Sequence, residues 1–158
     1  MGQGLDRGVR EALGMFADEL SAHRYIERLL WPEGVGCPRC SSTRVGKLDG
    51  ASTRLGTYKC YGCRKAFSLL HGTVMSSSHV PVHKWLQAIY LTEGGTKPMR
   101  PHHLHRILNV SSKTASSMIR RIAESAESLR SASTEGETPS RVPPPLPGTA
   151  SSAAMNMN

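Results

Sequence analysis

Apolar side chains recur at helical spacing along the second half of the chain. The strongest pattern follows Pro81, a residue suited to the first turn of a helix. Its apolar positions match i, i+3, i+4, i+7 and i+8 in full: Val82, Trp85, Leu86, Ile89 and Tyr90. A second, shorter pattern starts at Pro101, and a third follows Ser111, its expected N-cap, as far as about Leu129. The sequence therefore predicts three helices between residues 80 and 130, the last two joined by a tight turn.

The first half of the chain shows one helical pattern and then short apolar runs typical of strands. Residues 18–30 carry an apolar stripe at helical spacing, with Asp18 as the expected N-cap. Between residues 43 and 59, apolar residues flank the turn signal Asp49-Gly50, which predicts a hairpin of two strands. Residues 65–69 predict a third strand. This half is therefore expected to contain one helix and a small antiparallel sheet.

All four cysteines of the chain lie in two Cys-x2-Cys pairs, Cys37/Cys40 and Cys60/Cys63, with 19 residues between the pairs. Each pair presents two thiolates to one cation, and two facing pairs complete a tetrahedral sulfur shell. Gly62 is expected to supply the positive φ that turns its pair toward the metal. The spacing predicts one structural Zn²⁺. Two disulfides and a rubredoxin-like iron site are the alternatives, and no secretory signal favours disulfides.

The composition suggests that the fold needs a bound metal for stability, and the charge distribution indicates a class of binding partner. Only 38% of the 158 residues are hydrophobic and 5% are aromatic, and a small core of this kind usually needs a metal or other cross-link. The net charge of +8 is concentrated, because residues 37–79 carry seven Lys/Arg against one Asp/Glu and residues 80–130 carry eight against three. Clustered positive charge is typical of nucleic-acid-binding proteins, with a plain soluble basic surface as the alternative.

The last predicted helix carries polar and basic side chains opposite its apolar stripe. With the two helices before it, it would form a helix-turn-helix, in which the second helix of the pair enters the major groove with its N-terminal residues first. Hydroxyl groups bind base edges or phosphates, and arginine can bind guanine through two hydrogen bonds. An ordinary surface helix is the alternative. The candidate DNA-binding residues are Ser112, Lys113, Ser116, Ser117, Arg120 and Arg121.

The predicted fold class is small α+β, with four segments along the chain. Residues 1–15 are expected to form a flexible N-terminus, and residues 16–70 a helix plus a zinc ribbon with a three-stranded antiparallel sheet. Residues 80–130 are expected to form the all-α helix-turn-helix, and residues 131–158 a disordered tail rich in proline and serine. No apolar run has the length of a signal peptide or a membrane span, which predicts a cytoplasmic protein with no membrane partner. No small-molecule substrate is expected either.

The order of these pieces resembles the N-terminal part of bacterial insertion-sequence transposases. In that family a zinc ribbon and a helix-turn-helix precede a DDE-type catalytic domain. Ser41 departs from the family pattern, in which glycine is frequent, and is expected to strain the first cysteine pair slightly. The resemblance covers about residues 16–127 and is carried by the motifs at residues 30–34, 37–40, 58–60, 63–68, 72–74, 81–90 and 110–115.

A larger departure from that family lies at the C-terminal end. The resemblance implies a ribonuclease-H-like domain with acidic metal ligands, whereas Glu124, Glu127, Glu135 and Glu137 are the acidic residues after position 120. Strand transfer needs carboxylates that are held rigidly around two divalent metals. The sequence therefore predicts a nucleoid-associated DNA-binding protein that is not an enzyme and is truncated before the catalytic domain.

Double-stranded DNA is the expected partner, and a full-length transposase is a second candidate partner. Two other functions are the alternatives to DNA binding. One is a protein-interaction adaptor or regulator that docks its zinc ribbon on a transposase or polymerase. The other is an active transposase or nuclease, against which the missing carboxylate domain argues.

Overall fold

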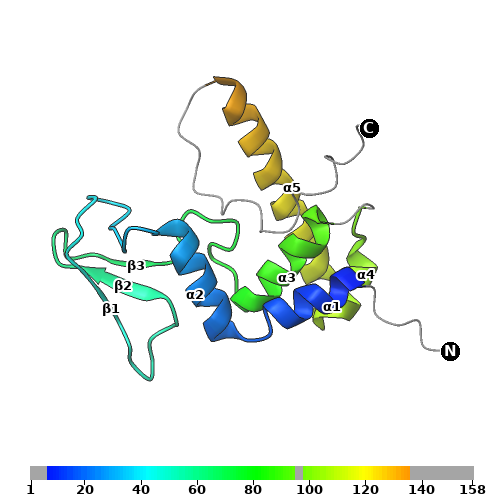
Figure 1. Cartoon of the computed structure of the whole chain (residues 1–158), viewed down its shortest axis with the longest axis horizontal. Helices are drawn as coiled ribbons and strands as arrows, with labels where there is room; N and C mark the ends of the chain where they lie inside the picture. The colour runs from blue at the N-terminus through cyan, green and yellow to red at the C-terminus, as the bar shows by residue number, and fades with distance from the viewer. Residues whose placement is uncertain (1–6, 95–97, 136–158) are drawn as a thin grey trace, which may run out of the picture.

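The computed structural model describes residues 7–94 and 98–135. Figure 1 shows the small sheet at one side, α2 beside it, and the remaining helices at the other side. This is the predicted small α+β architecture, although residues 136–158 of the predicted tail lie outside the described residues. The elements are α1 (Arg7–Met15), α2 (Glu19–Leu30), β1 (Val45–Lys47), β2 (Thr57–Cys60), β3 (Ala66–Ser68), α3 (Val82–Glu93), α4 (Pro101–Leu108) and α5 (Ser112–Glu135).

The three strands form an antiparallel sheet in the order β1-β2-β3. Its register places Tyr58 opposite both Lys47 and Phe67, so the rings of Tyr58 and Phe67 share one face. Trp31, which follows α2, packs edge-on against that face, with ring centroids 5.5 Å from Tyr58 and 6.2 Å from Phe67. Aromatic pairs of this kind add about 0.5–1.5 kcal/mol beyond their buried area. The three buried rings therefore attach α2 to the sheet.

Helix α1 corrects the prediction of a flexible N-terminus for residues 7–15, whereas residues 1–6 of that predicted segment lie outside the described residues. Val9 and the following Phe16 are buried, and Leu13 packs against the same core. Their spacing of four and three residues places them on one side of the helix, which packs against α3. The carbonyl of Phe16 also accepts a 2.7 Å hydrogen bond from Gln87 Nε2 in α3. Four glycines in this segment concealed the pattern, because glycine disfavours a helix by about 1 kcal/mol.

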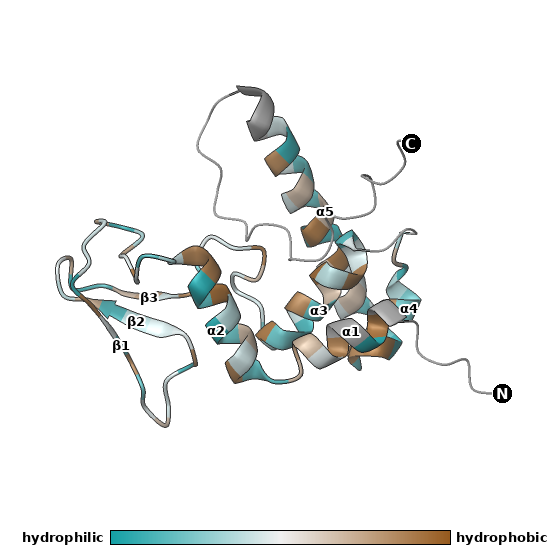
Figure 2. Cartoon of the chain, viewed as in Figure 1, coloured by the Kyte–Doolittle hydropathy of each residue, from teal (hydrophilic) through white to brown (hydrophobic). Residues whose placement is uncertain are grey.

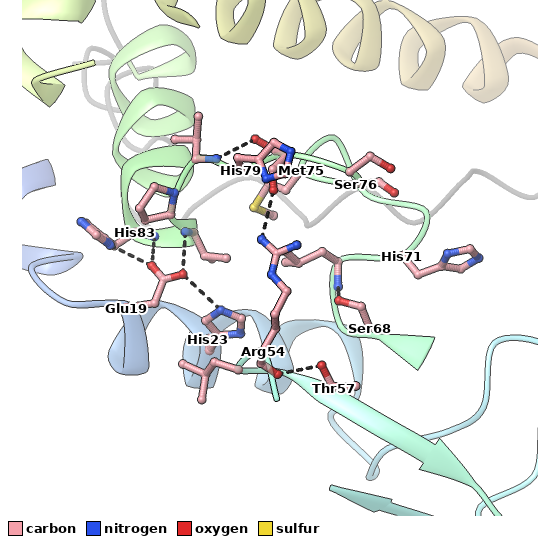
Figure 3. Close-up of a pocket in the computed structure, with 17 residues that line it drawn as sticks. Glu19, His23, Arg54, Thr57, Ser68, His71, Met75, Ser76, His79 and His83 are labelled. Atoms are coloured by element: carbon pink, nitrogen blue, oxygen red, sulfur yellow. Dashed lines mark hydrogen bonds and ion pairs between the residues drawn. The ribbon is translucent and has the colours of Figure 1, made fainter. Parts of the chain in front are cut away.

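Helix α2 begins at Asp18, which is its N-cap as predicted, but the next residue caps a different helix. The Glu19 carboxylate accepts hydrogen bonds from the N–H groups of Val82 (2.9 Å) and His83 (3.1 Å) in the first turn of α3. Figure 3 shows this carboxylate between the rings of His23 and His83. Partial burial raises the pKa of Glu19, but these donors outweigh it and hold the pKa below its usual 4.5.

The helices α1, α3, α4 and α5 enclose buried side chains that belong to the same hydrophobic core as those of the ribbon. Trp85 and Leu86 of α3 are at most 1% exposed, and Leu104 of α4 is inaccessible. In Figure 2, brown apolar positions gather where these helices meet, whereas the C-terminal half of α5 projects away from them. The predicted apolar stripe of α5 ends at Ile122 and is buried except for Ile119, which is half-buried. The buried α5 residues are Ala115, Met118 and Ile122.

A three-residue turn joins α4 to α5. Asn109 ends α4 in the left-handed conformation, with φ 50°, which asparagine adopts more readily than most residues. The Oγ of Ser111 accepts a 3.0 Å hydrogen bond from the Thr114 N–H, as expected of an N-cap. The tight turn and the cap therefore lie where the sequence predicted them. Helix α5 continues to Glu135, beyond the predicted end near Leu129.

Candidate metal centre and helix surface

The four cysteine sulfurs form one cluster, and all of them lie within 4.8 Å of one another. The sulfurs of Cys37 and Cys63 are 3.8 Å apart, and those of Cys40 and Cys60 are 3.5 Å apart. A tetrahedral Zn²⁺ site with Zn–S bonds of about 2.3 Å has sulfur–sulfur distances of about 3.8 Å, whereas a disulfide requires about 2.05 Å. The four cysteines are free. Their geometry fits one tetrahedral metal ion and does not fit the disulfide alternative.

The two cysteine pairs share one backbone pattern, although one lies in a loop and the other in the β2–β3 turn. The Cys37 N–H donates to the carbonyl of Ser42 at 3.0 Å, and the Cys60 N–H donates to the carbonyl of Lys65 at 2.9 Å. Each donor precedes its acceptor by five residues, so each turn brings both of its thiols to the same side. Two equivalent turns that face each other produce the four-sulfur cluster.

The residue after the second cysteine of each pair is in the left-handed conformation, with φ 58° at Ser41 and 59° at Arg64. This corrects the prediction that Gly62 supplies the positive φ. Gly62 supplies space instead, because a Cβ there would lie 3.0 Å from Ser42 Oγ and 3.5 Å from Cys60 Sγ. The positive φ also explains why glycine is frequent at the position of Ser41 in the family pattern. A serine there has an energetic cost, because its Cβ is unfavourable in the left-handed region.

Replacing Ser41 with glycine is expected to stabilise the zinc-loaded protein by about 1 kcal/mol, the order of cost that a side chain incurs in the left-handed region. The measurement is the melting temperature at saturating zinc. Ser52→Gly in the exposed β1–β2 turn is the matched control, since Ser52 is not among the residues with positive φ. An equal or larger gain from Ser52→Gly would contradict the explanation.

Hydrogen bonding to sulfur prepares one cysteine to bind metal. The Cys63 N–H points at Cys60 Sγ over 3.5 Å and, as the main cause, lowers the pKa of the Cys60 thiol to about 6. The thiolate is the form that binds zinc. With four sulfur ligands the shell has no open position for water or substrate, which is the arrangement of structural zinc sites. Zinc would therefore hold the ribbon together through these residues and supply no reaction.

Most of the predicted DNA-binding residues lie together on the outer surface of α5. Ser112, Lys113, Ser116 and Arg120 are exposed, and Ser117 is half-buried. The Ser116 hydroxyl donates to the carbonyl of Ser112 at 3.0 Å, within the helix. Arg120 lies 3.8 Å from Glu124, and both side chains are about two-thirds exposed, so this ion pair is weak. The first turns of α5 thus present hydroxyl and cationic groups on the side opposite the core.

Arg121 does not belong to this surface, which corrects its prediction as a DNA-binding residue. Its Nη2 donates to the carbonyl of Ser76 at 2.7 Å, and its guanidinium lies 5.2 Å from the ring of Trp85. Position 121 comes three residues after Met118, on the buried side of the helix. Arg121 therefore fastens α5 to the segment that precedes α3, and sequence spacing alone did not separate it from Arg120.

Comparisons with known proteins agree with the assignment of a zinc ribbon. Residues 17–66 match the family of transposase zinc-ribbon domains of the IS1595 type. A 75-residue stretch is 32% identical to an "Uncharacterized protein in transposable element ISH50" from Halobacterium salinarum, and it covers 48% of this chain and 25% of that protein. No solved structure matches. That relative is archaeal, so the bacterial origin implied by the resemblance to bacterial transposases is not supported. No described helix has the length and apolarity to cross a membrane.

Proposed function

We propose that this chain, with a transposase zinc-ribbon domain at residues 17–66, binds double-stranded DNA through the first turns of α5. The observation that carries the proposal is the surface formed by Ser112, Lys113, Ser116 and Arg120, which is exposed while the opposite side of the same helix is buried. A short turn and a serine cap set the angle between α4 and α5. This arrangement has the features of a helix-turn-helix, in which α5 would be the recognition helix.

The side chains on this surface suit the edges of base pairs. Serine hydroxyls donate to or accept from bases and phosphates, and the Arg120 guanidinium matches the two acceptors of guanine in the major groove. The Glu124 carboxylate near Arg120 is exposed, so DNA can displace it at little cost. Lys113 lies in the first turn of α5, where it can neutralise a phosphate.

The rest of the fold supports α5 in this role. Zinc would hold the ribbon, the aromatic rings join the ribbon to α2, and Glu19 joins α2 to α3. Helix α3 packs against both α4 and α5. The basic ribbon adds a sequence-independent attraction for DNA that depends steeply on salt.

We place this DNA binding in transposition, where the chain would recognise DNA and would not carry out strand transfer. The family matched by the ribbon and the printed name of the ISH50 relative both support that context. Strand transfer uses carboxylates that hold two divalent metals. In the described residues, the grouped metal ligands are the four cysteines. We therefore propose that the described part of the chain positions DNA and leaves catalysis to another domain or subunit.

The test is a selection on random duplexes with the zinc-loaded protein, followed by titration of the enriched site. Lys113→Ala is expected to weaken binding to all duplexes by about the same factor and to reduce the salt slope by about 0.9, which is the loss of one phosphate contact. Arg120→Ala is expected to weaken the enriched site by about 1–3 kcal/mol and to relax the preference at one base pair.

Arg130→Ala is the matched control, because it removes the same charge from the exposed C-terminal half of α5. It should leave the selected sequence and the affinity nearly unchanged. Equal effects of the Arg120 and Arg130 substitutions would reject α5 as the recognition helix. If binding survives both the Lys113 and the Arg120 substitution, DNA binding by this surface is wrong, and docking of the ribbon on another protein becomes the better function.

A further inference from the structure

The sheet has a second face, opposite the rings that pack on Trp31. Gly46 of β1, Lys59 of β2 and Ala66 of β3 lie opposite one another in the register and so share this face. We call these three residues, together with Tyr61, the outer face. Lys59 and Ala66 are exposed, and the small residues Gly46 and Ala66 lie on either side of Lys59, which is in the central strand. Tyr61 is 54% exposed, the highest value among the large hydrophobic side chains of the described residues.

Tyr61 is held on this face by contacts at both ends of the residue. Its N–H donates to the carbonyl of Arg44 at 2.8 Å. Its ring lies over Gly46, where a Cβ would come within 2.8 Å of Tyr61 Oη and 3.0 Å of the ring carbon Cε2. Gly46 is not among the glycines with positive φ, so its role here is to make room for the ring. The tip of the ring therefore lies against β1, and the exposed part of the side chain is accessible to a planar ligand.

Four cations without carboxylate partners lie in the strands and turns next to Tyr61 in the ribbon. Arg44, Lys59, Arg64 and Lys65 are exposed, and none of them forms an ion pair within the described residues. Lys47 differs, since it lies on the face of Tyr58 and pairs with Glu27 at 3.5 Å. A single acidic residue, Asp49, occurs among residues 37–79. The outer face thus carries Lys59 beside the exposed Tyr61, and the part of the ribbon around it has an excess of positive charge.

We infer that the outer face of the ribbon binds single-stranded DNA, with a base stacked on Tyr61 and phosphates bound by Lys59 and its neighbouring cations. An exposed ring can stack only on a base whose own face is free, and duplex DNA covers the faces of its bases. A positive groove or surface that carries aromatic platforms is the arrangement by which proteins bind single strands. An acidic protein would satisfy the cations but would leave the open face of the ring without a planar partner.

This site is separate from the α5 surface, so the two can be tested apart. The probes are a fluorescent oligo-dT strand, an abasic strand of the same length, a duplex and an oligo-U RNA, each titrated by anisotropy. The protein is the full chain loaded with zinc and carrying Lys113→Ala and Arg120→Ala, which suppresses the proposed duplex site. Oligo-dT is expected to bind this protein more tightly than the abasic strand and the duplex.

Tyr61→Ala in this background should weaken oligo-dT binding by about 5- to 100-fold, the effect of losing one stacked base. The salt slope should not change, and abasic binding should stay the same. Tyr61→Phe should retain affinity, because the ring is kept. Lys59→Ala should reduce the slope by about 0.7, the loss of one phosphate contact on a single strand, while Lys47→Ala, on the opposite face, should not.

Three results would overturn the inference. Equal affinity for oligo-dT and the abasic strand would leave a purely electrostatic patch. An unchanged oligo-dT affinity in Tyr61→Ala with full zinc content would remove the stacking site. Tighter binding of oligo-U than of oligo-dT would replace the DNA assignment with RNA. Failure of duplex recognition by α5 would change none of these readouts.

Discussion

Replacing Cys60 with serine is expected to abolish stoichiometric zinc binding and to unfold the ribbon. Cys60 is fully buried at the end of β2, and its sulfur lies 3.5 Å from that of Cys40. Structural zinc contributes an apparent 10–16 kcal/mol at about pH 7, comparable with or larger than the ~5–15 kcal/mol stability of a whole domain. Chelation of zinc from the unmodified protein should give the same state. The measurements are metal content per chain and the near-ultraviolet circular dichroism of Trp31 and Tyr58, which pack together.

The control for this substitution is Ser52→Ala, which changes an exposed residue of the ribbon away from the sulfur cluster. It should keep one zinc per chain and the aromatic signal. The helical signal of α3, α4 and α5 should fall less than the aromatic signal in Cys60→Ser, because these three helices also pack against one another. A Cys60→Ser protein that keeps a native ribbon without metal would contradict the structural role of zinc.

Replacing Glu19 with glutamine is expected to destabilise the protein by about 2 kcal/mol, the scale of hydrogen bonds to a charged group. The two N–H donors at the start of α3 and the His83 ring all bond to this carboxylate. Glutamine keeps one oxygen acceptor but loses the second oxygen and the charge that favours a helix N-terminus. The measurement is the free energy of unfolding in denaturant at pH 7 with saturating zinc.

The same contact predicts a pH dependence with a defined sign. The pKa of Glu19 is lower in the folded protein than the usual 4.5, so the unfolded chain binds the proton more tightly. Its stabilisation is therefore complete above the unfolded pKa and is lost as the pH falls through the lower, folded pKa. Glu19→Gln should flatten stability below about pH 4.5. Glu124→Gln, at an exposed position on α5, should leave both the stability and its pH profile unchanged.

The sequence was sufficient to predict most of the ribbon and the helices because the deciding signals are local. The two Cys-x2-Cys pairs identify all four ligands, and the break at Asp49-Gly50 separates β1 from β2. The apolar spacing after Pro81 is the buried side of α3, and Ser111 caps α5. Helix α1 was not predicted, because the side chains on its buried side pack against α3, which lies more than 60 residues further along the chain.

Side-chain contacts between residues far apart in the sequence could not be predicted from the spacing of residue types. Pro81 stands at the start of α3 without a side-chain cap of its own, and Glu19, 62 residues earlier, supplies the acceptor. Pro81 occupies the N-cap position and has no side-chain acceptor, which was a signal that the cap comes from elsewhere. Arg121 turned inward for a similar reason, since its partners lie in other segments. Tyr61 was overlooked because its exposure depends on Gly46 in another strand.

The packing of Trp31 on the sheet determines where the chain can be truncated without exposing apolar side chains. A peptide limited to residues 37–68 would keep every metal ligand and yet leave Tyr58 and Phe67 open to water, because it lacks Trp31, which packs on them. Such a peptide should load zinc and self-associate through those rings. A fragment that starts at Arg7 and ends at Glu93 retains α2 together with the helix that Glu19 caps. The smallest fragment that stays soluble when expressed alone is thus determined by the burial of Tyr58 and Phe67 under Trp31, and not by the positions of the cysteines.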